Sequence, residues 1–285
     1  MRNIILCILS AILFVGCNTA RQNDGKKTIY VTIAPLRMLV EEVSCHDFDV
    51  EVLVPRGASP ENFEPTVGQL KALHDAQYIF STGLITFEQG LLSAIDDRAK
   101  IADLSCGITT IEGSCTHHHH KHSHGIDPHI WTSPRALRKM VENIHGTLRA
   151  SYPDSAKYGE AAERLMARLD SLDDECRRAI AEAGVKAMMI YHPAYTYYAR
   201  DYGIEQIAIE HDGKEPSPKR LVSLVEMAHK NNITTILYQP QYGEEKLRAI
   251  ARECGADIVM TDPLAEDIIR EIERVTEIIC HRDAE

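Results

Sequence analysis

The sequence lacks several patterns that would place it in common functional classes. After its first residues it has no apolar run near the roughly 18 residues of a membrane-spanning helix, so we expect a soluble body. It has no Cys-x-x-Cys pair for a thiolate zinc site and no His-Glu-x-x-His motif of a metallopeptidase. Basic residues are in deficit, with 31 Lys and Arg against 42 Asp and Glu, which disfavours nucleic-acid binding. An acidic chain of this kind suits a cation as its ligand.

The N-terminus is predicted to be a leader and a tether. Arg2 precedes an apolar run at residues 4–15, and Gly-Cys follows it, with the cysteine at position 17. A run of this length is typical of an export signal, and the small residue before Cys17 resembles a bacterial lipobox. We expect residues 1–16 to be removed and Cys17 to carry lipid, with residues 17–27 tethering an exported protein to a membrane. The protein would then lie in the periplasm or at the cell surface; ordinary cleavage to a free protein is the alternative.

A histidine cluster interrupts the middle of the chain, where residues 117–129 read HHHHKHSHGIDPH. An expression tag would lie at a terminus, and no packing or capping rule requires such a run. Imidazole is a ligand for Zn, Cu, Ni and Fe(II), and histidine-rich tracts are typical of metal binding. We predict that residues 115–125 form a polar loop whose histidines collect metal without fixed spacing. These histidines are His117, His118, His119, His120, His122 and His124.

Short β-rich runs alternate with helical patterns on both sides of this loop. Strands are predicted at residues 28–33, 50–54, 78–81 and 100–103, and again at 185–191, 204–209, 233–238 and 256–260. Helices are predicted at 35–43, 67–75, 87–96, from 134 onward, 193–203, from about 218 to 231, 244–254 and 264–281. Strands alternating with helices form parallel sheets with helices on both faces. We therefore predict an α/β fold with two similar lobes, residues 28–150 and 184–285.

A long helix is predicted to join the two lobes. Residues 154–182 contain no proline and a single glycine, Gly159. Apolar residues recur there at spacings of three and four, the period of a helix face. We therefore predict that residues 151–183 link the lobes as a single helix, which is unusually long for a globular domain.

Four candidate metal ligands follow predicted strands, and each adjoins a proline. In open α/β sheets, ligands bind outside the carboxyl ends of the strands. Singly, each candidate has an ordinary alternative role, such as a helix N-cap for an aspartate. Together, two imidazoles and two carboxylates make a four-coordinate site for a divalent ion. The candidates are Glu61, His129, His192 and Asp262.

Four segments resemble the metal-binding solute-binding proteins of ABC transporters, the zinc and manganese group of ZnuA and TroA type. They read GASPENFEPT at 57–66, DPHIWTSP at 127–134, YHPAYTYY at 191–198 and DPL at 262–264. The resemblance covers nearly all of residues 28–281. It implies two lobes on a rigid backbone helix and metal in the cleft between them, held by the same four candidates. It also implies a monomeric carrier, not an enzyme, that delivers its ion to a membrane permease for import.

The sequence indicates the identity of the ion less clearly than the presence of a metal site. Glu61 stands where family members usually carry histidine, and a set with two carboxylates tolerates Mn²⁺ or Fe²⁺ better. The histidine loop favours Zn²⁺, which is our prediction, and a manganese or iron carrier is the alternative. Gln239 stands where relatives often have glutamate, and we expect no ligand there.

Two hypotheses from other classes remain. A metal-buffering surface adhesin would bind the ion without a permease. A metallohydrolase would need an open coordination position and a base, for which Glu64 and Glu88 are the candidates. Four protein ligands would close that position.

Six cysteines remain once Cys7 leaves with the leader and Cys17 takes the lipid. They are Cys45, Cys106, Cys115, Cys176, Cys254 and Cys280. Export permits disulfides, and Cys106 with Cys115 and Cys254 with Cys280 are candidate pairs. Spacing alone leaves the pairing open.

Overall fold

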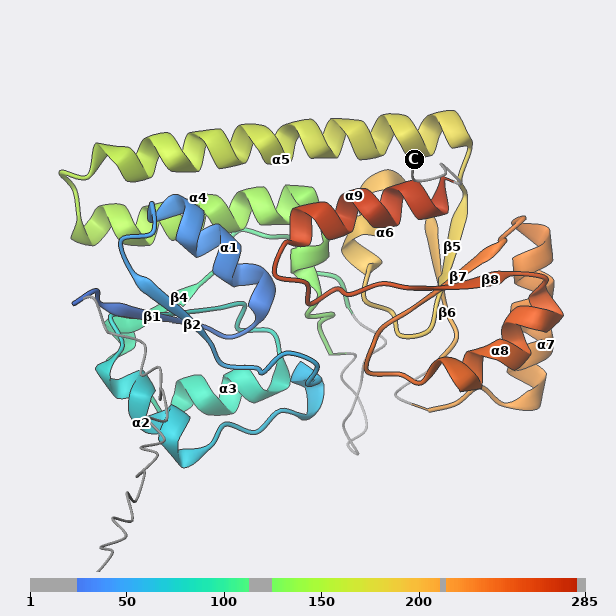
Figure 1. The fold of residues 1–285 in the computed structure, drawn as a ribbon, viewed down its shortest axis with the longest axis horizontal. Helices are drawn as coiled ribbons and strands as arrows, with labels where there is room; N and C mark the ends of the chain where they lie inside the picture. Colours follow the sequence, from blue (N-terminus) through green and yellow to red (C-terminus); the bar gives the residue numbers. More distant parts are fainter. Residues whose placement is uncertain (1–24, 113–124, 211–213, 281–285) are drawn as a thin grey trace, which may run out of the picture.

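The computed structural model describes residues 25–112, 125–210 and 214–280, which form two α/β lobes beneath one long helix (Figure 1). This confirms the predicted fold class. None of the helices in these three segments combines the length and the apolar character that a membrane crossing requires. Cys17, Cys115 and the six histidines of the loop lie outside the described residues. The predictions made for them stay predictions.

Each lobe is built on a parallel sheet of four strands, and both sheets have the same order of strands. The first sheet runs β2-β1-β3-β4, with β1 at Thr28–Val31, β2 at Asp49–Val52, β3 at Tyr78–Ser81 and β4 at Ile101–Asp103. The second runs β6-β5-β7-β8, with β5 at Ala187–Ile190, β6 at Glu205–Ala208, β7 at Thr235–Tyr238 and β8 at Asp257–Met260. In both sheets the strand order reverses beside the first strand, where ligands of such folds bind.

Helices cover both faces of each sheet (Figure 1). In the first lobe they are α1 Ala34–Val43, α2 Val67–Asp75, α3 Thr86–Ser93 and α4 Pro134–Ser151. In the second they are α6 Thr196–Tyr202, α7 Pro218–Lys230, α8 Glu244–Cys254 and α9 Ile268–Ile279. The linking helix α5 spans Ala156–Ala183 and lies across both lobes. Short 3₁₀ turns occupy Pro60–Asn62, Arg98–Lys100 and Ile130–Thr132.

Two helices begin later than the sequence predicts. A tight turn follows His192, in which the Ala194 N–H donates to the His192 carbonyl at 2.8 Å, so α6 begins at Thr196 instead of Pro193. At the end of the chain, α9 begins four residues after the predicted start. Its N-cap is Asp267, whose side chain accepts the Arg270 N–H at 3.0 Å. Because both helices begin late, an irregular segment follows each of the strands β5 and β8. Ligand sites of such folds are built from segments of this kind.

One hydrophobic core passes through both lobes. It contains the buried faces of α1, α4, α5, α6 and α9, and α5 contributes Leu165, Leu169, Leu172 and Cys176 to it. Trp131, Tyr195, Tyr197 and Tyr198 are among its largest fully buried side chains. Interiors are packed as densely as organic crystals, so side chains that interdigitate in this way transmit strain and resist sliding. The two lobes are therefore joined by packing as well as by the chain.

Two smaller cores lie on the opposite faces of the sheets. One packs α2 and α3 on the first sheet through Leu53, Leu73, Ile79 and Leu91. The other packs α7 and α8 on the second sheet through Met189, Ile207, Leu224 and Leu247. Each sheet is thus buried on both faces, as parallel sheets usually are.

Cys254 and Cys280, one of the two candidate pairs, do not form a disulfide. Cys254 ends α8 in the outer core of the second lobe, whereas Cys280 follows α9 in the shared core. The two sulfurs therefore lie on opposite faces of the second sheet. Among the cysteines that the structure describes, none is in a disulfide. The Cys106–Cys115 pair involves a residue outside the described segments.

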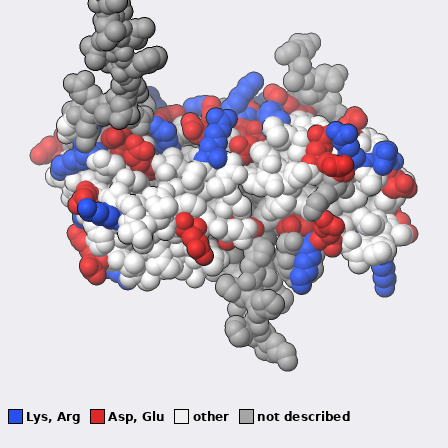
Figure 2. Space-filling model, turned by 60° about the horizontal axis from the view of Figure 1, so that its bottom comes forward, with Lys and Arg blue, Asp and Glu red and all other residues white. Residues whose placement is uncertain are grey.

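Charged side chains are dispersed over the surface. Figure 2 shows one face, on which Lys and Arg alternate with Asp and Glu among broad uncharged areas. The described residues on this face form no continuous basic stripe.

The left-handed end of α5 gives a test of the fold. Gly184 has φ of 67°, and a Cβ there would meet nothing within 4 Å, so Gly184→Ala adds backbone strain without a clash. We expect the free energy of unfolding in urea to fall by about 1 kcal/mol. The control is Gly146→Ala, at an exposed and uncrowded position inside α4, which should raise it by about 0.5 to 1 kcal/mol. Equal effects of the two substitutions would contradict this account of the helix end.

Candidate metal centre

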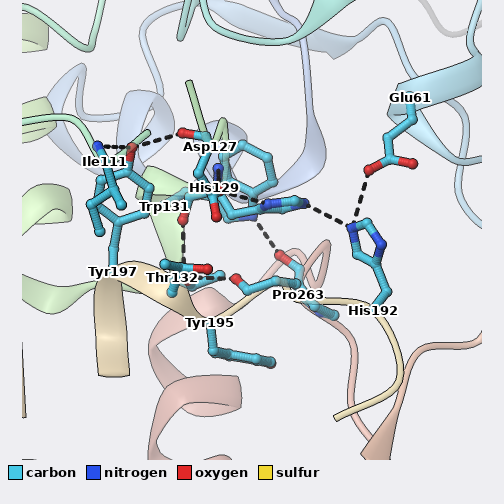
Figure 3. Close-up of polar contacts among 12 residues, drawn as sticks. Glu61, Ile111, Asp127, His129, Trp131, Thr132, His192, Tyr195, Tyr197 and Pro263 are labelled. Atoms are coloured by element: carbon cyan, nitrogen blue, oxygen red, sulfur yellow. Dashed lines mark hydrogen bonds and ion pairs between the residues drawn. The ribbon is translucent and has the colours of Figure 1, made fainter. Parts of the chain in front are cut away.

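Three of the four predicted ligands meet between the lobes. Glu61 comes from the turn Pro60–Asn62, His129 immediately precedes the turn Ile130–Thr132, and His192 follows β5. The His192 Nε2 atom lies 3.1 Å from Glu61 Oε1 and 3.4 Å from His129 Nε2. One ligand atom from each residue lies within 4.8 Å of the others. Figure 3 shows Glu61 and His129 both facing the His192 ring.

Asp262 does not join this group. Its Oδ1 atom accepts the Leu264 N–H at 3.0 Å, and its own N–H donates to Glu271 Oε1 at 2.8 Å. The next two residues, Pro263 and Leu264, line the same small cavity as the three ligands. The structure therefore brings the Asp262 segment to the site, while the carboxylate itself caps the turn after β8.

His129 is oriented by a carboxylate two residues before it. Asp127 Oδ1 accepts both the backbone N–H and the Nδ1 side of His129, each at 2.9 Å. Burial acts to raise the pKa of Asp127, but the charge and hydrogen bonds of His129 outweigh it and hold that pKa below its usual range. A carboxylate on Nδ1 leaves the Nε2 lone pair for a metal, which is the common arrangement of metal-binding histidines.

His192 is held by residues from both neighbouring strands. Its Nδ1 lies 2.6 Å from Oε1 of Glu210, which follows β6. Gln239, which follows β7, donates to the His192 carbonyl at 2.7 Å and accepts the His192 N–H at 3.3 Å. The ring of Tyr242 stacks on the imidazole at 5.6 Å. His192 is only 6% exposed, so its orientation is fixed on several sides.

The charge of His192 follows from the same contacts. Burial lowers its pKa, but the hydrogen bonds and negative charges of Glu210 and Glu61 outweigh burial and raise the pKa to about 9. In the protein without metal, His192 is therefore protonated at neutral pH. A metal ion must displace this proton to bind Nε2.

The segment that carries His129 is tied to the second lobe (Figure 3). Trp131 Nε1 donates to the Pro263 carbonyl at 2.8 Å, and Thr132 Oγ1 contacts the Ala194 carbonyl at 3.0 Å. Tyr197 donates its hydroxyl to the Asp127 carbonyl at 2.7 Å. These bonds cross between segments 62 to 132 residues apart in the chain. They hold the His129 segment in a fixed position relative to the second lobe, which carries His192. Glu61 belongs to the first lobe.

The space between the ligands is small. The cavity is bounded by Pro60, Trp131, Tyr242, Pro263 and the ligands themselves, and it has a volume of about 30 Å³. A space of this size between three candidate ligands suits a small ion.

Neither candidate base of the hydrolase hypothesis lines this cavity. Glu88 is 0% exposed, and its two oxygens accept hydrogen bonds from Thr82 and Ile85 at the start of α3. Burial raises the pKa of this carboxyl. Glu88 thus caps the loop after β3, and Glu64 is an exposed residue just after the Pro60–Asn62 turn.

Two residues that position His192 were not predicted from the sequence. Glu210 contacts its ring, and Gln239 hydrogen-bonds its backbone. Gln239 directly follows β7 and Glu210 lies two residues after β6, so the rule that selected the candidate ligands also applies to these two positions. Their partner is His192, and this pairing depends on the strand order β6-β5-β7. Gln239 is not among the three grouped ligands, and its amide serves the His192 backbone instead.

The chain matches the family model described as ZnuA, zinc-uptake complex component A periplasmic, over residues 29–273. It is 29% identical over 274 residues to the zinc-binding lipoprotein AdcA of Streptococcus pneumoniae, an alignment covering 92% of this chain and 55% of that protein. The chain thus spans about half the length of that relative.

Solved structures agree in fold over most of the chain. A crystal structure of ZnuA superimposes with a TM-score of 0.81 at 31% identity, covering 90% of this chain and 98% of that one. The Zn(II)-bound ZnuA-like domain of Streptococcus pneumoniae AdcA gives a TM-score of 0.75 at 26% identity, covering 92% of this chain and 100% of that one. Together with the arrangement of Glu61, His129 and His192, these matches show that the chain belongs to the ZnuA family of metal-binding solute-binding proteins.

Proposed function

We propose that this protein binds zinc outside the cytoplasmic membrane and delivers it to an ABC permease for import. The observation that carries the proposal is the pair of buried histidines whose Nε2 atoms lie 3.4 Å apart beside Glu61. In a tetrahedral zinc site with bonds of about 2.05 Å, two nitrogen ligands lie about 3.3 Å apart. The two imidazoles and the carboxylate therefore already have nearly the spacing that Zn²⁺ requires.

Asp262 is the proposed fourth ligand. Its segment lines the cavity, and its carboxylate caps the turn through Oδ1. To bind an ion through Oδ1, the carboxylate would have to release the Leu264 N–H. Four protein ligands would close the coordination sphere, which suits a carrier and leaves no position for a substrate.

The remaining parts of the proposal concern segments outside the described residues. The six histidines of the loop would collect zinc and raise its concentration near the site. Cys17 would carry the lipid that anchors a monomer to the membrane surface. The names of the relatives support export and lipid anchoring, since the AdcA relative is a zinc-binding lipoprotein. A surface adhesin that only buffers metal would share the ion site but have no permease partner.

A manganese or iron carrier is the second candidate, and Glu61 is the observation that favours it. Carboxylates suit Mn²⁺ better than imidazoles do. Two of the three grouped ligands are nevertheless imidazoles, which favour zinc. The ion preference therefore depends on which ligands dominate the site.

Removing His192 tests the proposed site directly. We expect His192→Ala to weaken zinc binding by at least about 100-fold, because the variant loses a ligand atom and leaves Glu210 without its partner. The measurement is a competition titration against a chromogenic chelator. His229→Ala, on the exposed face of α7, is the control and should bind zinc like the wild type. Unchanged affinity in His192→Ala would contradict the proposed site.

Replacing Glu61 tests the ion preference. Glu61→His adds a third imidazole to the group, so we expect the ratio of zinc to manganese affinity to rise on the order of tenfold. Parallel titrations with both ions measure this ratio. Glu64→His, an exposed exchange in the same loop, should leave it unchanged. An unaltered ratio in Glu61→His would mean that Glu61 does not bind the ion.

The proton on His192 predicts a pH dependence. Because its pKa is about 9 without metal, the ring carries a proton that zinc must displace at pH 7. Below that pKa, zinc affinity should rise with pH by up to about tenfold per unit between about pH 6 and 8. Competition titrations at several pH values measure the slope. A flat profile over this interval would contradict the hydrogen-bonded, charged state of His192.

A further inference from the structure

Glu210 is a buried carboxylate that belongs to none of the four sequence segments at 57–66, 127–134, 191–198 and 262–264. It is 6% exposed, and its Oε1 atom is 2.6 Å from Nδ1 of His192. We infer that Glu210 is a positioning residue for metal capture, which selects Nε2 of His192 as the ligand atom and holds the ring toward the ion. The inference rests on the proposed function, and it concerns a residue that does not itself touch the metal.

The backbone of Glu210 is fixed relative to His192. Strands β5 and β6 pair in parallel, and the pairing continues beyond them, because the Ile209 N–H donates to the Ile190 carbonyl at 2.9 Å. The Glu210 N–H then donates to the Tyr191 carbonyl at 3.1 Å. Glu210 is therefore held by the sheet itself beside the residue that precedes His192. Its side chain needs no loop movement to reach the ring.

The chemistry of imidazole explains what this contact does. A neutral histidine has one N–H and one lone pair on its two ring nitrogens. Glu210 can only accept a hydrogen bond when ionised, so it places the N–H on Nδ1 and leaves the lone pair on Nε2. The Nε2 atom is the one that faces Glu61 and His129. The opposite tautomer would direct a lone pair at a buried carboxylate, which is costly.

Gln239 completes this arrangement from the other side. In the order β6-β5-β7, the strand before His192 lies between the strands before Glu210 and Gln239. Glu210 thus fixes the side chain of His192 from one neighbouring strand, and Gln239 fixes its backbone from the other. His129 is oriented differently, by Asp127 within its own segment. In the second lobe, residues on neighbouring strands therefore fix the orientation of His192 before any metal binds.

Two substitutions of Glu210 separate its geometry from its charge. Glu210→Ala removes the hydrogen-bond acceptor, and Glu210→Gln keeps an acceptor oxygen and the side-chain volume without the charge. We expect zinc affinity, measured by chelator competition, to fall by about 10- to 100-fold in Glu210→Ala and by less in Glu210→Gln. Glu205→Ala, at the exposed start of the same strand, is the matched control and should bind zinc normally.

A spectroscopic readout separates positioning from a general loss of structure. In zinc-loaded, nitrogen-15-labelled protein, the Nδ1–H of His192 should give a slowly exchanging, strongly downfield proton signal. We expect Glu210→Gln to retain this signal in shifted form and Glu210→Ala to lose it. Glu205→Ala should leave it where it is in the wild type.

Two results would overturn the inference. One is zinc affinity in Glu210→Ala within roughly threefold of the wild type, well below the loss expected for a residue that orients a ligand. The other is a loss of affinity in Glu210→Ala with the His192 Nδ1–H signal unchanged. Failure of the wild type to bind zinc tightly would instead contradict the proposed function, and the inference with it. The wild-type titration thus distinguishes the two failures.

Discussion

The arrangement of the site depends on the single hydrophobic core that runs beneath α5 through both lobes. Trp131 lies in this core and donates across to Pro263, so the segment that carries His129 is packed and hydrogen-bonded against the second lobe. Independent rotation of the lobes would have to break that packing, at the usual penalty for opening a dense interior. We therefore expect ion exchange to involve local segments such as the Pro60–Asn62 turn more than a hinge between whole lobes.

The site itself balances buried charges. Asp127 and Glu210 are carboxylates with little exposure, and burying them without partners would be strongly unfavourable. Each is paired with an imidazole, so the same contacts that satisfy the carboxylates also aim the histidines. A proton on His192 stabilises this arrangement without metal, and under the proposed function a divalent ion would take its place. Metal capture, as proposed, would thereby use charges and hydrogen bonds that folding has already put in place.

Much of this could be predicted from local sequence. The strand β3 and the helices α2 and α8 have the predicted limits, because their ends carry local signals: Thr66 caps α2, and Gly255 ends α8 in the left-handed conformation. Glu61, His129 and His192 were predicted because ligands gather at the carboxyl ends of strands, and the structure brings these three residues together. These features depend on residues close together in the chain.

The rest depends on contacts between distant segments. Glu210 could not be assigned to His192 without knowing that β6 lies beside β5. The helix predicted from residue 264 begins only at Ile268, after the cap Asp267. The candidate Cys254–Cys280 pair does not form, because α8 and α9 pack on opposite faces of the second sheet. Sequence spacing does not encode which face of a sheet a helix covers.

The most direct test of a preset site is a pair of crystal structures of the protein, one without metal and one loaded with zinc. The account predicts that His129 Nε2 and His192 Nε2, 3.4 Å apart here, shift relative to each other by less than about 0.5 Å between the two. It also predicts that Glu210 remains hydrogen-bonded to His192 in both. Histidines several ångströms apart without metal would show that the ion, and not the fold, assembles the site.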